Sequence, residues 1–279
     1  MANERSGKLE ARTVTIDKLS ASTRHEMWHL FQRYYADIKH DQFELDLAAK
    51  TAVILLLDSR DKSVQGFSTL EVYKRDINGK SVHAVYSGDT IISEGYWGQS
   101  ALQIAFAKFL GKEFIKNKCQ PIHWFLISKG YKTYLLFSRN LLEYYPRFDK
   151  PTPIWEKALI NSLASDKFGS DWKPEKGVLQ FQNAAGRLLE GVAPIDQTLI
   201  IRHEDIRFFA EQNPGHVDGD ELCCIGTISI QTFGHFISRV TAKLNGPLVE
   251  QFQTLTASLK NKPKNQSSNQ SGANLEDNA

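Results

Sequence analysis

The chain is poor in cysteine, which limits the kinds of site it can build. Its 279 residues include three cysteines, Cys119, Cys223 and Cys224, too few for a disulfide framework. No CxxC pair and no spaced set of cysteines and histidines is present, so a structural zinc site is not expected. Such cysteine usage suits a reducing compartment, and we expect a cytoplasmic protein.

Long apolar runs are also missing. The longest strongly apolar run, residues 52–57, is far shorter than the roughly 20 residues that span a bilayer. The first residues, MANERSGKLEARTV, contain no apolar signal core. We therefore expect a soluble protein without a membrane span.

The chain has no large excess of charge of either sign. It carries 34 basic and 32 acidic residues, a formal net charge of +2. Sequence-independent binding of nucleic acids needs clustered Lys and Arg in excess, so no nucleic-acid partner is expected. Apolar residues make up 41% of the chain, which is enough for a packed core and excludes disorder throughout.

The first half of the chain contains alternating helix and strand patterns. Apolar residues at helical spacing predict helices, and apolar runs bounded by polar turns predict strands. In chain order we expect a strand over 12–16, helices over 21–37 and 41–49, strands over 51–57, 64–77 and 80–92, a helix over 101–116, a strand over 121–127 and a helix over 130–142. The Asn78-Gly79 pair is typical of a type I′ hairpin turn, so the strands on either side of it are expected to be antiparallel.

The second half is less regular. Residues 144–153 carry three prolines and indicate a boundary. Beyond them, helical patterns cover 152–165, 206–212 and 230–244, and a short strand is expected over 221–225. The last residues show no apolar periodicity. We expect three parts: a domain over residues 1–150, a mainly helical extension over 151–260 and a disordered tail over 261–279.

A glycine-spaced loop joins the third long strand to the following helix. It lies within TIISEGYWGQSAL, residues 90–102, where Gly95 and Gly98 flank Tyr96 and Trp97. Unpaired amides at a helix N-terminus form an anion site, especially where glycines allow close approach. The loop alone permits two interpretations: a turn that needs glycine for its backbone geometry, or a cradle for a phosphate.

The order of these elements resembles the GCN5-related N-acetyltransferase (GNAT) superfamily. In that family the loop after the fourth strand carries Q/R-x-x-G-x-G/A and binds the pyrophosphate of acetyl-coenzyme A. The matching segment here runs from Gly95 to Ser100: Gly98 matches the central glycine, while Gly95 replaces Gln or Arg and Ser100 replaces Gly or Ala. The resemblance covers about residues 10–148. It implies an α/β (α+β) fold with a mixed, mostly antiparallel sheet flanked by helices.

The resemblance also implies a ligand and the residues that bind it. Acetyl-coenzyme A or another acyl-coenzyme A would be the co-substrate, a small-molecule or peptide amine would be the acceptor, and no metal would be needed. The backbone of Ile91 and Ile92 would bind the pantetheine arm. The pyrophosphate would lie against Gly95, Tyr96, Trp97, Gly98, Gln99 and Ser100.

Direct attack of an amine on the thioester needs a base and an acid. Asp89 and Glu71 are the base candidates, because a carboxylate near the end of these strands could accept the amine proton. The resemblance implies Tyr131 or Tyr134, after the fifth strand, as the acid. The alternatives are ordinary solvated carboxylates and tyrosines that pack in the core.

Four further residues could suggest a metal site. The spacing of His203, His216, Asp218 and Asp220 matches no established set of metal ligands, so a polar loop is the favoured interpretation.

The leading hypothesis for the whole chain is acyl transfer from a coenzyme A thioester to an amine. Its rival is a non-catalytic GNAT-like protein that binds a coenzyme A-like or acyl-carrier ligand, or a protein partner.

Overall fold

The computed structural model describes residues 7–181 and 186–242. Its helices are α1 (Ala21–Gln32), α2 (His40–Ala48), α3 (Ala101–Lys116), α4 (Tyr131–Asn140), α5 (Ile154–Phe168), α6 (Gln197–Arg202), α7 (Glu204–Gln212) and α8 (Ile230–Thr241). Its strands are β1 (Leu9–Thr15), β2 (Tyr35–Ala36), β3 (Ala52–Asp58), β4 (Val64–Ile77), β5 (Lys80–Ile92), β6 (Ile122–Ser128), β7 (Tyr144–Tyr145), β8 (Trp172–Lys173), β9 (Val178–Leu179), β10 (Arg187–Leu188) and β11 (Glu221–Ile228).

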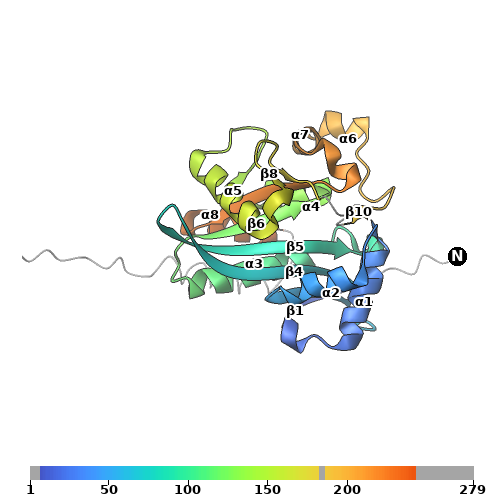
Figure 1. The fold of residues 1–279 in the computed structure, drawn as a ribbon. Coiled ribbons are helices and arrows are strands. Elements are labelled where there is room, and N and C mark those ends of the chain that lie inside the picture. Colours follow the sequence, from blue (N-terminus) through green and yellow to red (C-terminus); the bar gives the residue numbers. More distant parts are fainter. Residues whose placement is uncertain (1–6, 182–185, 243–279) are drawn as a thin grey trace, which may run out of the picture.

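One large sheet organises the molecule (Figure 1). Its strands follow the order β1-β3-β4-β5-β6-β11-β9-β8, and β7 pairs with β11 beside this path. Neighbouring strands are antiparallel except β5 and β6, which are parallel because α3 connects them. The expected mixed, mostly antiparallel sheet is confirmed.

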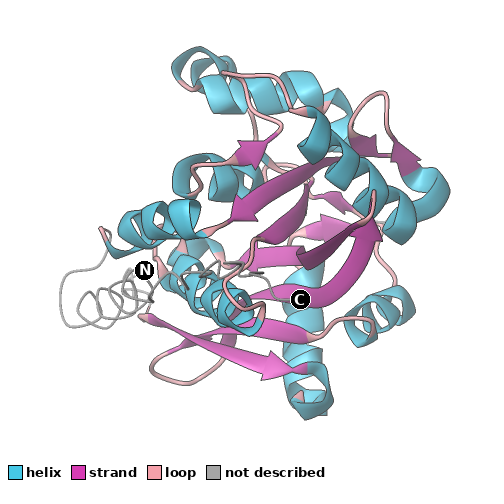
Figure 2. Ribbon diagram, turned by 90° about the vertical axis from the view of Figure 1, so that its left-hand side faces the viewer, coloured by secondary structure: helices cyan, strands magenta, loops and turns pink. Residues whose placement is uncertain are grey.

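Helices lie on both sides of the sheet, as Figure 2 shows. Apolar side chains of α3, α4 and α8 pack on one face, while α1 and α2 cover one part of the other face and α5 covers another. Strand β3 lies between these layers, and all seven of its residues are buried. Its continuous apolar run in the sequence is explained by this burial on two faces.

Local signals predicted several elements well. Asn78 and Gly79 have φ angles of 52° and 73°, as a type I′ turn between β4 and β5 requires. Helix α3 has the expected bounds, 101–116. Its wide apolar stripe packs in the main core through Leu102, Phe106 and Phe114.

The helix expected over 21–37 was predicted too long. It ends at Gln32, and Tyr35–Ala36 instead form β2, which pairs with β10 from a distant part of the chain. Asp37 then adopts a positive φ of 57°, which a continuing helix does not allow. The apolar spacing extended through Tyr35 because this residue is half-buried in the strand rather than in a helix.

The sheet also crosses the expected boundary at residue 150. The short strand expected over 221–225 is β11, which extends to Ile228 and lies between β6 and β9. It pairs with β6 over Leu222–Ile228 and contributes Cys224 and Ile225 to the buried core. The expected tail, 261–279, lies outside the described residues.

Candidate functional site

Strands β5 and β6 separate partway along their length. They pair from His83 to Ser87 on β5, opposite Ile122 to Leu126 on β6. Beyond Ser87, β5 continues beside β4 alone as far as Ile92. The edge of β5 that faces β6 is therefore open over its last residues.

A cavity of about 200 Å³ occupies this opening. Its walls come from the end of β5, the turn after β6, the starts of α3 and α4, the link between α1 and α2, and the segment after β10. Its lining includes Tyr35, Gly88, Asp89, Ile91, Ile92, Trp97, Leu102, Gln103, Ile127, Lys129, Gly130, Lys132, Thr133, Leu136, Leu188, Val192, Ala193 and Glu221.

A β-bulge aims Asp89 into the cavity. The register of β4 and β5 shifts between Ser68 and Leu70, so Gly88 and Asp89 together lie opposite Thr69. Position 88 must be glycine because an added Cβ would lie 2.8 Å from the Thr69 hydroxyl oxygen. Bulges of this kind redirect side chains next to active sites.

The carboxylate of Asp89 is partly buried and has no side-chain partner among the described residues. Among the described residues, no hydrogen bond or ion pair joins it to another side chain, although it lines the cavity. Burial raises its pKa, and the positive charges of Lys50 and Lys129 partly offset that rise. Such a shift brings a carboxyl group closer to the range in which a general base works.

A second carboxylate, from β11, lines the same cavity. Glu221 is buried and forms a 2.6 Å ion pair with Lys129, which is itself nearly buried. Burial raises the pKa of Glu221, and the Lys129 ammonium group opposes this shift. Sequence reasoning missed both residues, since nothing local indicates that β11 pairs with β6.

Tyr35 and Lys50 complete this polar region. Burial and the charge of Asp89 raise the pKa of the Tyr35 phenol, so this group stays protonated. The ammonium of Lys50 donates a hydrogen bond to the carbonyl of Asp46 at 2.8 Å, and burial lowers its pKa. Polar and charged side chains thus surround Asp89.

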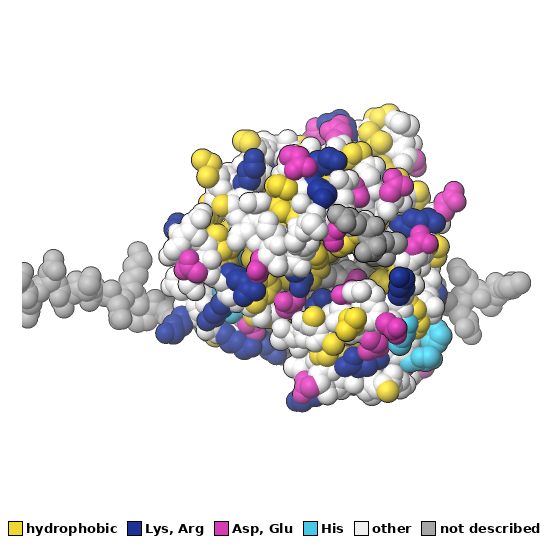
Figure 3. All heavy atoms as spheres, viewed as in Figure 1, with side chains coloured by type: hydrophobic (Ala, Val, Ile, Leu, Met, Phe, Trp, Pro, Cys, Tyr) yellow, Lys and Arg dark blue, Asp and Glu magenta, His cyan; other side chains and the backbone are white. Residues whose placement is uncertain are grey.

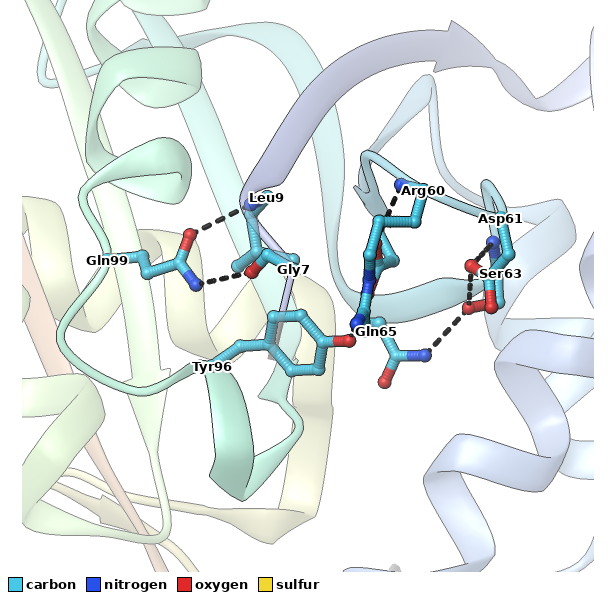
Figure 4. Close-up of polar contacts among 9 residues, drawn as sticks. Gly7, Leu9, Arg60, Asp61, Ser63, Gln65, Tyr96 and Gln99 are labelled. Carbon is cyan, nitrogen blue, oxygen red and sulfur yellow. Dashed lines mark hydrogen bonds and ion pairs between the residues drawn. The ribbon is translucent and has the colours of Figure 1, made fainter. Parts of the chain in front are cut away.

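Two side chains fix the loop after β5. The Gln99 amide accepts a hydrogen bond from the Leu9 N–H at 2.8 Å and donates one to the Gly7 carbonyl at 3.1 Å (Figure 4). The Tyr96 hydroxyl donates a hydrogen bond to the buried carboxylate of Asp58. Both side chains tie the loop to β1 and β3, so any ligand contact from positions 96 and 99 would come from the backbone.

Gly98 and the start of α3 present backbone to the open side of the loop. Gly98 has a φ of 85°, and an added Cβ would meet no atom within 4 Å. The side chain of Ser100 makes no capping hydrogen bond, so the first amides of α3 keep their free N–H groups at the helix end. Gly95 begins this bend within a short 3₁₀ turn, Glu94–Tyr96.

Trp97 bridges the loop to α4 at the cavity wall. Its indole N–H donates to the Ile92 carbonyl at 2.8 Å, and its ring lies 3.3 Å from the Lys132 ammonium nitrogen. The contact is a cation–π interaction. This contact places the positive charge of Lys132 beside the glycine loop. The indole hydrogen bond occupies the Ile92 carbonyl, one of the acceptors on the free edge of β5.

The tyrosine candidates differ in position from Asp89. Tyr134 is fully buried away from the cavity wall, and its hydroxyl donates to the Pro146 carbonyl at 3.1 Å. Tyr131 begins α4 next to the lining residues Gly130 and Lys132, and burial raises its pKa. Glu71 forms an ion pair with Lys167 instead of lining the cavity. The structure therefore brings together Asp89, Ile91, Ile92 and Trp97 from the predicted set, and leaves Glu71 and Tyr134 apart from them.

A second, larger groove of about 760 Å³ lies between α5 and the β8–β9 turn. It lies away from the open edge of β5 and includes Lys157, Glu175 and Lys176 on its walls. Size alone would favour it as a ligand site, but the cavity at β5 has the converging polar groups with shifted pKa values.

Within residues 7–181 and 186–242, side chains of His, Cys, Asp and Glu do not gather in groups of three that could hold a metal ion. In the same part of the chain, none of the helices combines the length and the apolar character needed to cross a bilayer. On the face drawn in Figure 3, basic and acidic side chains are interspersed, in keeping with the near-neutral net charge.

Comparisons with known proteins give low similarity. No protein-family model and no curated protein matches the chain. A solved structure from Enterococcus faecalis V583, described as a probable N-acyltransferase, is 14% identical with a TM-score of 0.35, over 48% of this chain and 33% of that one. A GNAT family N-acetyltransferase from Escherichia coli in complex with CoA is 13% identical with a TM-score of 0.32, over 47% and 67%. N-myristoyltransferase from Saccharomyces cerevisiae with bound myristoyl-CoA is 11% identical with a TM-score of 0.33, over 46% and 31%.

The matched part of this chain thus covers only about a third of the Enterococcus faecalis protein and about a third of the N-myristoyltransferase. Similarities this weak add no argument about activity, and the fold is assigned from the topology itself. The order β1-β3-β4-β5-β6, the parallel pairing of β5 with β6 and the glycine-bearing loop before α3 give this chain a GNAT-like fold.

Proposed function

We propose that this protein transfers an acyl group from a coenzyme A thioester to an amine acceptor. The observation that carries the proposal is Asp89, an unpaired carboxylate with a raised pKa on the wall of a cavity between separating strands. A base in this position can accept a proton from an amine that attacks a thioester held along β5.

The open edge of β5 is the proposed site of the pantetheine arm. An extended ligand can add to a free strand edge through backbone hydrogen bonds, as another strand would. Ile91 and Ile92 line the cavity along this edge. The thioester would then lie beside Asp89, and the pyrophosphate would reach the loop before α3.

The proposed reaction needs no covalent intermediate on the protein. The amine nitrogen forms a bond to the thioester carbonyl carbon, and the carbon–sulfur bond breaks with its electron pair going to sulfur. The proton lost by the amine goes to the Asp89 carboxylate, directly or through one water molecule. The thiolate takes its proton from solvent, and the Thr133 hydroxyl on the cavity wall can donate a hydrogen bond to the sulfur as its charge develops.

The glycine loop and Lys132 form the proposed pyrophosphate site. Free amides at the start of α3 and the helix dipole favour a negative charge there. Lys132, held against Trp97, adds a positive charge from α4. Gln99 and Tyr96 hold the loop in place rather than contact the phosphates through their side chains.

Two variants at one position test this placement. Asn and Asp both tolerate the positive φ of Gly98, and the space around this residue is open, so both variants should fold. They differ chiefly in charge. We expect Gly98→Asp to weaken acetyl-coenzyme A binding at least tenfold relative to Gly98→Asn, measured by calorimetric titration. Equal affinities of the two variants would show that the pyrophosphate binds elsewhere.

The hydrogen bond from the Trp97 indole to the Ile92 carbonyl favours a second candidate function. The protein would then bind a coenzyme A-like or acyl-carrier ligand without catalysing transfer. The indole N–H occupies a carbonyl that an extended thioester ligand would otherwise use. Thiol release with a panel of amines separates the two functions. Tight binding of acyl-coenzyme A without thiol release for any amine would favour the binding protein, and release that depends on an amine would favour the transferase.

A further inference from the structure

The segment 187–193, which begins with β10, contributes to the wall of the same cavity. The pairing of β10 with β2 places Leu188 opposite Tyr35, and the Leu189 N–H donates to the Tyr34 carbonyl at 3.0 Å. An ion pair of 2.9 Å between Arg187 and Asp37 adds to this attachment. Three contacts with one short link thus fix this segment against the first part of the chain.

Apolar side chains of this segment close the cavity at the turn between β6 and α4. A Cβ added to Gly130 would lie 3.0 Å from a methyl carbon of Leu188 and 3.9 Å from the Cβ of Ala193. Ala193 is buried and has a φ of 52°, a conformation uncommon for residues other than glycine. A residue in this strained conformation persists only where the surrounding side chains fix it, so we expect the backbone of this wall to be rigid.

The lining of the cavity therefore combines two kinds of side chain. Asp89, Lys129 and Glu221 are its charged residues. Leu188, Val192 and Ala193, together with Leu136 on α4, give it an apolar wall. An acetyl group brings a single methyl group to such a wall, whereas a longer acyl chain would cover it with methylene groups.

We propose that Leu188, Val192 and Ala193 form an acyl-binding wall, and that the preferred thioester carries a medium-length acyl chain rather than acetyl. The inference rests on the proposed transferase function. The thioester carbon lies beside Asp89, and the acyl chain extends across the cavity from β5 to the apolar wall. Each methylene buried there raises kcat/KM about fourfold until the cavity is filled.

Thiol release with acetyl-, butanoyl-, hexanoyl- and octanoyl-coenzyme A at a fixed amine concentration tests the wall. The wild type is expected to show kcat/KM at least tenfold higher for hexanoyl- than for acetyl-coenzyme A. Val192→Phe should narrow the cavity and lower that ratio at least tenfold, because the larger side chain would exclude the longer acyl chains first. Leu188→Ala should shift the preference to longer chains.

Ile201→Phe is the matched control, because Ile201 lies on α6 in the same region and is exposed to solvent. It should leave the ratio unchanged. An acetyl preference in the wild type, or an unchanged ratio in a Val192→Phe variant that melts cooperatively, overturns the inference. A changed KM for the amine at a constant acyl ratio also overturns it, because the wall would then contact the acceptor.

Failure of the proposed function gives a different result. In that case the wild type releases thiol from none of the four thioesters with any amine. Dissociation constants of the same four thioesters, measured by calorimetry, then test the wall without turnover. Affinity that does not rise with chain length in the wild type refutes the wall.

Discussion

At the scale of single residues, Asp89 is expected to lower stability while it supports catalysis. Its pKa is higher in the folded than in the unfolded chain because burial disfavours the charged form. The carboxyl group of Asp89 therefore binds its proton more tightly in the folded state, and the free energy of unfolding falls as pH rises from the unfolded-state pKa to the folded-state pKa. At higher pH the ionised carboxylate destabilises the fold.

Asp89→Asn is therefore expected to change activity and stability in opposite directions. The variant should lose the base and reduce kcat/KM by about 10²- to 10⁴-fold. It should also raise the melting temperature at neutral pH. Asp166→Asn is the control, since Asp166 is half-exposed and paired with Arg75 at the surface. A variant at position 89 with wild-type kcat/KM would exclude Asp89 as the base.

A neighbouring lysine offers a test of the same carboxylate through pH. The positive charge of Lys50 lowers the pKa of Asp89 relative to burial alone. Lys50→Met removes that charge, so the pKa of Asp89 should rise further. We expect the ascending, acidic limb of the profile of kcat/KM against pH to move to higher pH. Lys62→Met, which removes an exposed lysine paired with Glu10, should leave the limb in place.

The direction of that shift is decisive. If the limb stays where it is, or moves to lower pH, the ionisation that controls the rate does not belong to a group near Lys50. Glu221 would then be the candidate base, because burial raises its pKa and Lys129, not Lys50, opposes that rise.

At the scale of elements, the glycine loop depends on tethers to other strands. Gln99 makes two hydrogen bonds to the backbone next to and within β1. We expect Gln99→Ala to lower the free energy of unfolding by roughly 1–3 kcal/mol, because two backbone groups lose a partner. Denaturant titration measures this loss. Gln42→Ala, at an exposed site on α2, should cost much less, and equal losses for the two variants would contradict the tethering role.

The elements predicted best from sequence are those with local signals. The Asn78-Gly79 turn and the apolar stripe of α3 depend on neighbouring residues alone, so both appear at the expected positions. The Asp89 side chain points into the cavity because of a β-bulge between β4 and β5, and no sequence pattern in either strand indicates this shift of register. The Lys129–Glu221 ion pair forms because β11 pairs with β6, and these two strands are far apart in the sequence. Local reasoning therefore located the loop and the strand, and it missed the charged side chains that line the cavity with Asp89.

At the scale of the whole molecule, the second half of the chain completes the site. Glu221 on β11 lines the same cavity as Asp89, and the segment 187–193 contributes the apolar wall. Helix α5 covers the sheet face beside α1 and α2, where its Leu159 and Leu163 are buried. Cavity and core are thus both shared between the two halves.

Residues 1–150 are consequently expected not to fold alone as a stable domain. Without β11, the edge of β6 would lose its antiparallel partner over Leu222–Ile228 and expose an unpaired, apolar strand. The face of β6 and β5 under α5 would also lose its cover, including the surface around Phe125. We expect a fragment of residues 1–150 to aggregate or to melt without a cooperative transition, while the full chain melts cooperatively in the same buffer. Circular dichroism and size-exclusion chromatography measure both. A cooperative, monomeric fragment would instead support a domain boundary near residue 150 and would make β11 an addition to a sheet that is stable without it.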